Sequence, residues 1–263
     1  MALTEAELEK LLTHEVRYFS YGAPVIGTPF AWYLHNPELG EWLDANHALR
    51  LRDDGRGADV IADEVIAFFR SRGLTVAADV DPIAEAQGIG AALRRRGVMP
   101  TLDQMLLMHY PSGKPPALPD RGIHIRAVPN KSETADTKLW VDIVTGDDVG
   151  QPGEELWREV VRRESLFSEC RLYLAELQEQ PIGACDLFVA DGWGRIDSVQ
   201  TDAGFRRRGV ASAIVARAVA DSLAAGNTET YLFTEAGGAG EQVYSRLGFV
   251  PWELGVLRRH ILR

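Results

Sequence analysis

The segment at residues 199–212 has the residue types and spacing of a phosphate-binding loop. It reads as a strand end, a basic loop and a first helical turn, formed by Val199, Gln200, Thr201, Arg206, Arg207, Arg208, Gly209, Val210, Ala211 and Ser212. The first turn of a helix has backbone N–H groups without partners and carries the positive end of the helix dipole. Gly209 and Ala211 lack bulk, so a pyrophosphate can approach the main chain, and the arginines supply cations.

Two motifs in the second half of the chain resemble a known family. Residues 206–211 read Arg-x-x-Gly-x-Ala, which is similar to the acetyl-CoA signature Arg/Gln-x-x-Gly-x-Gly/Ala of the GCN5-related N-acetyltransferases (GNAT). Residues 244–249 read Tyr-x-x-Leu-Gly-Phe, which resembles the end of the last helix in that family. The order of strand, loop, helix, strand and helix between the motifs strengthens the resemblance.

The resemblance implies acetyl-CoA as cosubstrate, no metal, and roles for named residues. Two neighbouring strands part, and the pantetheine arm lies between them against main-chain groups of Val199 and Thr201. Main-chain groups near Val199 stabilise the oxyanion. The Tyr244 phenol faces the sulfur, and with an ordinary pKa of about 10 it can protonate the departing thiolate.

The sequence does not single out one general base. Glu235 follows the predicted strand beside the cleft, and its carboxylate could take a proton directly or through water. Asp197 and Asp186 lie on neighbouring predicted strands, and His124 begins the second half. A water chain without a named base is a further alternative.

Composition excludes several function classes. The net charge is −10 over 263 residues, so nucleic acid and anionic membranes are not expected partners, because those surfaces attract positive charge. Cys170 and Cys185 lack metal or disulfide spacing and indicate reduced thiols in a cytoplasmic protein. No apolar run is long enough to span a membrane, and the acidic start is unlike a signal peptide.

The second half predicts the elements that position this chemistry. The proline- and glycine-rich residues 111–122 form a linker. After it, strands are predicted at 123–128, 171–177, 181–190, 195–201 and 228–234, and helices at 134–144, 154–165 and 210–225. We expect a GNAT lobe over residues 123–263.

The first half repeats this order. Strands are predicted at 30–35, 46–52, 74–79 and 102–110, and helices from Thr4, at 58–72 and at 83–95. Residues 247–260 align with 96–109, with Gly, Pro and His in register. The sequence therefore predicts an α/β chain of two tandem lobes, each a mixed, mostly antiparallel sheet flanked by helices.

The first lobe, residues 1–110, is expected to be a degenerate copy. Residues 52–57 read Arg-Asp-Asp-Gly-Arg-Gly and fit the phosphate pattern literally. Asp53 and Asp54 would place negative charge where a pyrophosphate needs N–H donors. No tyrosine stands at the position equivalent to Tyr244.

Together these features predict an acetyl-CoA-dependent N-acetyltransferase that acts on a primary amine of a small molecule, amino acid or peptide, as a monomer or homodimer. The alternative is a non-catalytic protein that binds acetyl-CoA as a sensor or contacts a partner through the first lobe.

Overall fold

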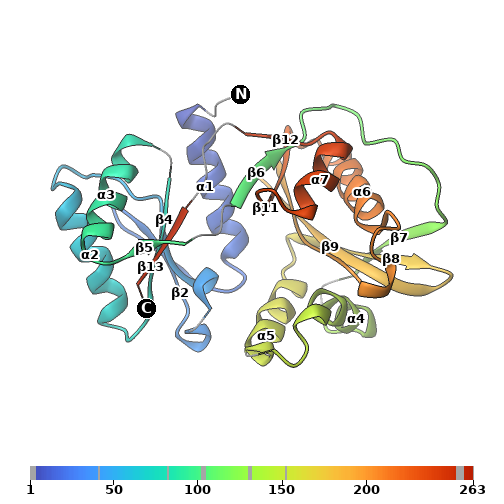
Figure 1. The fold of residues 1–263 in the computed structure, drawn as a ribbon, viewed down its shortest axis with the longest axis horizontal. Coiled ribbons are helices and arrows are strands. Elements are labelled where there is room, and N and C mark those ends of the chain that lie inside the picture. Colours follow the sequence, from blue (N-terminus) through green and yellow to red (C-terminus); the bar gives the residue numbers. More distant parts are fainter. Residues whose placement is uncertain are drawn as a thin grey trace. The chain divides into compact units, whose positions relative to one another are not determined.

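Two mixed sheets organise the chain, one in each of two compact units (Figure 1). The computed structural model describes residues 4–40, 42–81, 83–101, 105–129, 132–151, 153–252 and 258–262. The first unit comprises Met1–Leu107 with Trp252–Arg263, and the second comprises Met108–Pro251.

The first unit has a sheet in the order β1-β2-β3-β4-β13-β5. Its elements are α1 (Glu5–Phe19), β1 (Val25–Gly27), β2 (Trp32–His35), two 3₁₀ turns (Pro37–Leu39 and Leu43–Ala45), β3 (Asn46–Leu49), α2 (Ala58–Arg70), β4 (Val76–Val80), α3 (Ala84–Arg95), β5 (Met99–Pro100) and β13 (Arg258–Leu262). A capping box begins α1, because Thr4 accepts from the Glu7 N–H while the Glu7 carboxylate accepts from the Thr4 N–H. Apolar residues of α2 and α3, including Ile61, Val65 and Ile89, fill the core beside the sheet.

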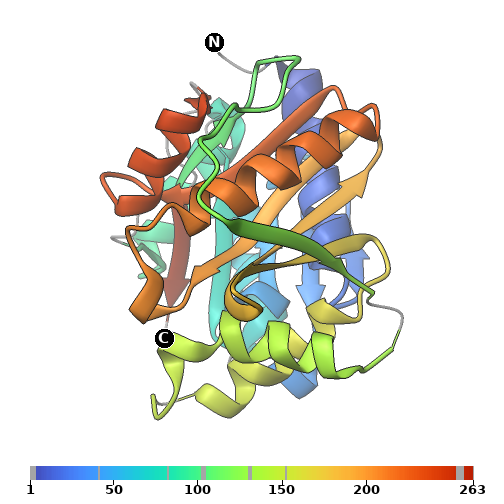
Figure 2. The same cartoon turned by 90° about the vertical axis from the view of Figure 1, so that its right-hand side faces the viewer.

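The second unit has a sheet in the order β12-β6-β11-β10-β9-β8-β7. Its elements are the end of β6 (Met105–His109), from Met108 on, followed by β7 (Ile123–Val128), α4 (Ala135–Val144), a 3₁₀ turn (Gly146–Asp148), α5 (Glu154–Ser165), β8 (Cys170–Leu177), β9 (Gln180–Ala190), β10 (Trp193–Thr201), a 3₁₀ turn (Ala203–Phe205), α6 (Val210–Ala224), β11 (Glu229–Glu235), α7 (Ala239–Leu247) and β12 (Val250–Pro251). Figure 2 looks onto this unit, with α6 running across the strands.

Two side chains attach helices to this sheet. The buried Trp140 of α4 donates to the Cys185 carbonyl of β9 at 3.0 Å. Tyr173 of β8 donates to Asp221 of α6 at 2.9 Å.

The predicted fold class is confirmed, and the predicted helices and strands are present with small changes at their ends. Strand β2 begins at Trp32, two residues late, and β3 ends at Leu49 because Arg50 adopts a positive φ of 53°. Of the strand predicted at 102–110, residues 102–104 lie outside the described residues.

The last strand of each repeat lies in an unexpected sheet. Strand β6, from the first half, pairs with β12 through Val250↔His109, and β13, at the end of the chain, pairs with β5 through His260↔Pro100. The aligned ends of the two repeats thus exchange their final strands. Residues 253–257 of the aligned segment lie outside the described residues. The predicted division into a first lobe that ends at residue 110 and a second lobe that begins at residue 123 remains a prediction.

Candidate functional site

Strands β10 and β11 part within the second sheet. Their parallel pairing covers Trp193–Arg195 against Glu229–Tyr231, although both strands continue beyond it. Past this point β10 bulges, since its register with β9 shifts between Asp197 and Gln200 and Ser198 adopts a φ of +51°. The later main chain of β10, with Val199, Gln200 and Thr201, therefore lies beside the opening between the strands.

The loop after β10 leads directly into α6. Gly209 has a φ of +90°, a conformation that favours glycine, and it is the residue before the helix. Among the described residues, no acceptor is recorded for the N–H groups of Gly209, Val210, Ala211 and Ser212. The positive end of α6 is therefore open to an anion.

The three arginines of this loop differ in their surroundings. Arg206 pairs with Asp147 and donates to the Thr201 carbonyl at 3.3 Å. The Arg208 guanidinium lies 5.1 Å from the centre of the Phe205 ring. Arg207 is exposed, and within the described ranges no acidic partner is recorded for it. Arg207 and Arg208 are therefore available to a phosphate, which would have to compete with Asp147 for Arg206.

Tyr244 of α7 is 8% exposed. Burial raises the pKa of its phenol, and the negative charge of Asp197 on β10 raises it further. The phenol is therefore protonated at neutral pH and can act as a proton donor.

The carboxylates proposed from the sequence occupy different environments. Asp197 pairs with Arg195 at 2.5 Å and accepts from the Ser198 N–H at 2.8 Å. Asp186 stands across from Asp197 in the sheet and is fully buried, which raises its pKa well above the ordinary value. Glu235 is exposed at the end of β11.

His124 lies apart from the opening. It is on edge strand β7, which β8 and β9 separate from β10, and its side chain is 74% exposed. His124 is therefore separated by two strands from the opening between β10 and β11.

A further buried acid lies at the bulge, outside the site residues predicted from the sequence. Glu164 of α5 is 1% exposed, and the Ser198 hydroxyl donates to its two carboxylate oxygens at 3.2 and 3.3 Å. Glu164 shares the buried side of α5 with Val160 and Val161. A charged residue at that spacing from apolar residues is a signal that could have identified it.

The corresponding loop of the first unit is occupied by its own side chain. The Asp53 carboxylate accepts from the Gly55 and Gly57 N–H groups, both at 2.9 Å, just before α2. Arg52 is held by Asp81 and Glu9. The Asp53 carboxylate thus occupies backbone donors that a phosphate would need.

The described residues contain neither a metal-binding cluster nor a helix that could span a membrane. No cluster of three or more His, Cys, Asp or Glu side chains there is arranged to hold a metal ion. None of the helices in those ranges combines the length and apolar character needed to cross a membrane.

Residues 168–251 match the family described as Acetyltransferase (GNAT) domain. This segment runs from just before β8 to the end of β12 and so contains the opening, the phosphate loop and Tyr244. A search of curated protein sequences found no match.

Several solved structures share the fold over most of the chain. A GCN5-related N-acetyltransferase from Kribbella flavida has a TM-score of 0.71 at 16% identity, covering 96% of this chain and 93% of its own. One from Sphaerobacter thermophilus has a TM-score of 0.63 at 21% identity, covering 89% and 77%. A tandem GNAT protein from the clavulanic acid biosynthesis pathway has a TM-score of 0.57 at 12% identity, covering 82% and 74%.

Proposed function

We propose that this chain, whose residues 168–251 match the GNAT acetyltransferase domain, transfers an acetyl group from acetyl-CoA to a primary amine. The observation that carries the proposal is the parting of β10 and β11 directly before the open N terminus of α6. A thioester arm and a pyrophosphate need these two features side by side.

The cofactor contacts follow from the free backbone groups. The pyrophosphate accepts from the N–H groups of Val210, Ala211 and Ser212, while Arg206, Arg207 and Arg208 neutralise its charge. Main-chain groups of Val199, Gln200 and Thr201 bind the pantetheine arm. Arg206 must exchange Asp147 for phosphate, so cofactor binding competes with that ion pair.

The reaction is a direct attack. The neutral amine nitrogen bonds to the thioester carbon, and main-chain N–H groups near Val199 stabilise the oxyanion. The carbon–sulfur bond then breaks, and Tyr244 gives its proton to the departing thiolate. The nitrogen loses a proton to a base, so the products are an amide and free CoA.

We propose two carboxylates, those of Glu235 and Asp197, as the candidates for the general base. Glu235, at the end of β11, is open to solvent and can act through water. Asp197 lies on β10 at the bulge, where its carboxylate already pairs with the Arg195 guanidinium. In Glu235→Gln and Asp197→Asn variants, loss of the acidic limb of the kcat/KM profile in one variant alone would identify the base.

The acceptor class is a small amine, an amino acid or a peptide terminus. A net charge of −10 suits a cationic acceptor. Both cysteines are buried free thiols, which supports a reducing compartment such as the cytoplasm.

The test combines acetyl-CoA titration calorimetry with thiol release across amines, amino acids and peptides. We expect one binding site per chain and release with at least one acceptor. Tyr244→Phe should lower kcat by about 10²-fold or more with little change in acetyl-CoA affinity. Tyr173→Phe is the matched control, because it removes a buried hydroxyl bonded to Asp221 of α6. Binding without release on any acceptor would favour the sensor alternative, and absence of binding would refute the phosphate loop.

A further inference from the structure

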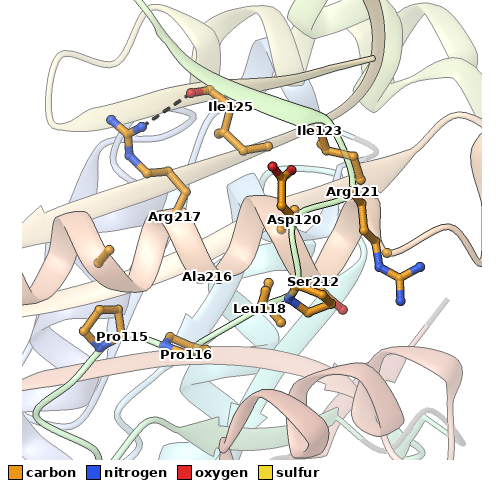
Figure 3. A pocket seen from close by; sticks show the side chains of 14 residues that line it. Pro115, Pro116, Leu118, Asp120, Arg121, Ile123, Ile125, Ser212, Ala216 and Arg217 are labelled. Atoms are coloured by element: carbon orange, nitrogen blue, oxygen red, sulfur yellow. Dashed lines mark hydrogen bonds between the residues drawn. The ribbon is translucent and has the colours of Figure 1, made fainter. Parts of the chain in front are cut away.

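A pocket of about 460 Å³ lies between the linker, strand β7 and one face of α6 (Figure 3). We call it the linker pocket. Six linker residues contribute one wall, namely Pro115, Pro116, Leu118, Pro119, Asp120 and Arg121, and Ile123 and Ile125 of β7 contribute another. All of these residues belong to the second unit.

The pocket is continuous with the phosphate loop. Gly209, Ser212, Ala213, Ala216 and Ala220 all line it. Their spacing of three and four residues places them on one face of α6. Gly209 is therefore both the end of the phosphate loop and the beginning of the pocket wall.

Most of the side chains that line the pocket are apolar, and Arg121, at the loop end, has no acidic partner among the described residues. Arg121 lies so close to Gly209 that a Cβ on the glycine would be 3.1 Å from the arginine Cδ. Figure 3 shows Arg121 on the same side of the pocket as Ser212. No ion pair of Arg121 is recorded within the described ranges.

The other arginine of the pocket is already engaged. Arg217 pairs with Asp221 at 3.0 Å and donates to the Ile125 carbonyl at 3.4 Å. Asp120, the acid of the pocket, accepts from the Gly122 N–H at 2.8 Å. Among the described residues of the pocket, Arg121 is thus the cation that can bind an anionic ligand without first breaking an ion pair.

We infer that the linker pocket receives the adenosine 3′-phosphate end of acetyl-CoA and that Arg121 binds the 3′-phosphate. The inference rests on the proposed function, which places the pyrophosphate at the adjoining turn of α6. The adenosine follows the pyrophosphate directly in the cofactor, so it must lie next to this turn. Apolar walls such as Pro116, Leu118 and Ala216 suit a flat base, and a guanidinium suits a phosphate.

This inference gives the linker a function besides joining the two halves of the chain. It also predicts a specificity for cofactors that carry the 3′-phosphate. Dephospho-CoA, which differs from CoA only in that group, is the probe that isolates it.

The experiment measures dissociation constants of CoA and dephospho-CoA by calorimetry on the full chain. The wild type should bind CoA at least about 10-fold more tightly than dephospho-CoA, because a charge-assisted contact is lost in the latter. Arg121→Gln should reduce this ratio to about 1–2 while leaving dephospho-CoA affinity nearly unchanged. Arg171→Gln, which changes an exposed arginine of β8 outside the pocket, is the matched control and should keep the wild-type ratio, with thermal melting confirming that each variant is folded.

A wild type that binds both ligands equally would overturn the inference and leave the proposed function standing. An Arg121→Gln variant that keeps the full preference would also overturn it. Absence of CoA binding to the wild type would remove the proposed function together with the inference. Ala216→Phe fills the apolar part of the pocket, and an unchanged CoA affinity in that folded variant would exclude the pocket as the adenosine site.

Discussion

Replacement of Gly183 by alanine should displace the start of α6 and so weaken cofactor binding. Gly183 lies on β9, and a Cβ there would be 2.7 Å from Val210 Cγ1 and 3.0 Å from the Gln200 carbonyl oxygen. Carbon atoms in favourable contact are about 3.5–4.0 Å apart. Val210 is the first residue of α6 and is 2% exposed, so it has no free space in which to retreat. The helix start must shift by roughly 1 Å to restore normal contacts.

The size of the effect follows from two opposing contributions. Overpacking a well-filled site costs about 1–3 kcal/mol. Alanine recovers about 0.5–1 kcal/mol relative to glycine in a strand. The free energy of unfolding should fall by about 0.5–2 kcal/mol, which lowers Tm by about 1–8 °C for a protein of this size. A 1 Å displacement of groups that hold a ligand can cost up to about 10²-fold, so the acetyl-CoA Kd should rise about 10-fold or more.

Thermal melting and calorimetric titration measure both effects. Gly113→Ala is the control, since nothing lies within 4 Å of a Cβ at that position and its φ is not positive. In Gly183→Ala/Val210→Ala, removal of the valine methyl groups relieves the closest contact, so the double variant should be more stable than the sum of the single effects predicts. If Gly183→Ala melts and binds like the wild type, the reasoning is refuted, because α6 would then not be held against β9 as described.

Three further predictions concern the first unit. Asp53→Ala removes the acceptor for two loop N–H groups and should lower the free energy of unfolding by about 0.5–2 kcal/mol in urea titrations. Burial raises the pKa of Asp81 to about 6, so the folded state binds the extra proton between pH 4 and 6. Stability should therefore fall as pH rises through this window, by about 1.4 kcal/mol per unit, and Asp81→Asn should remove that slope in pH-dependent urea unfolding. Arg259 pairs with both Asp44 and Asp79, and Arg259→Met should cost about 2–4 kcal/mol in the same assay, because Asp79 is then buried without its cation while the partial exposure of Arg259 moderates the loss.

Most of the secondary structure could be predicted from local sequence patterns. Helix α6 was predicted to begin at Val210 because a glycine precedes a run of alanine and apolar residues, and that is where it begins. The start of α1 followed from Thr4 and Glu7, whose side chains form the predicted cap. Such signals depend on residues within one or two turns of each other, so they are readable without the tertiary fold.

Features that depend on distant partners could not be predicted in the same way. The exchange of β6 and β13 depends on which sheet each strand joins, and nothing within either strand's own sequence specifies that sheet. The contact between Ser198 and Glu164 joins residues 34 positions apart and requires the bulge in β10. The repeat alignment identified equivalent segments, but equivalence does not specify which copy provides the neighbouring strand.

The two loops show how one carboxylate can decide whether a phosphate site is open. Each loop ends in a glycine with a φ of +90° immediately before a helix, Gly57 before α2 and Gly209 before α6. Asp53 stands four residues before Gly57, close enough to accept from its N–H at 2.9 Å. Asp202 stands seven residues before Gly209 and accepts instead from Gly204.

The N–H of the second glycine is therefore left for a ligand, whereas that of the first is taken by its own loop. Charge acts in the same direction, because the first turn of α2 contains Asp59 and that of α6 contains no acidic residue. A pyrophosphate at α2 would have to displace one carboxylate and approach another. The position of the acid relative to the glycine, rather than the presence of the glycine pattern, thus separates the two loops.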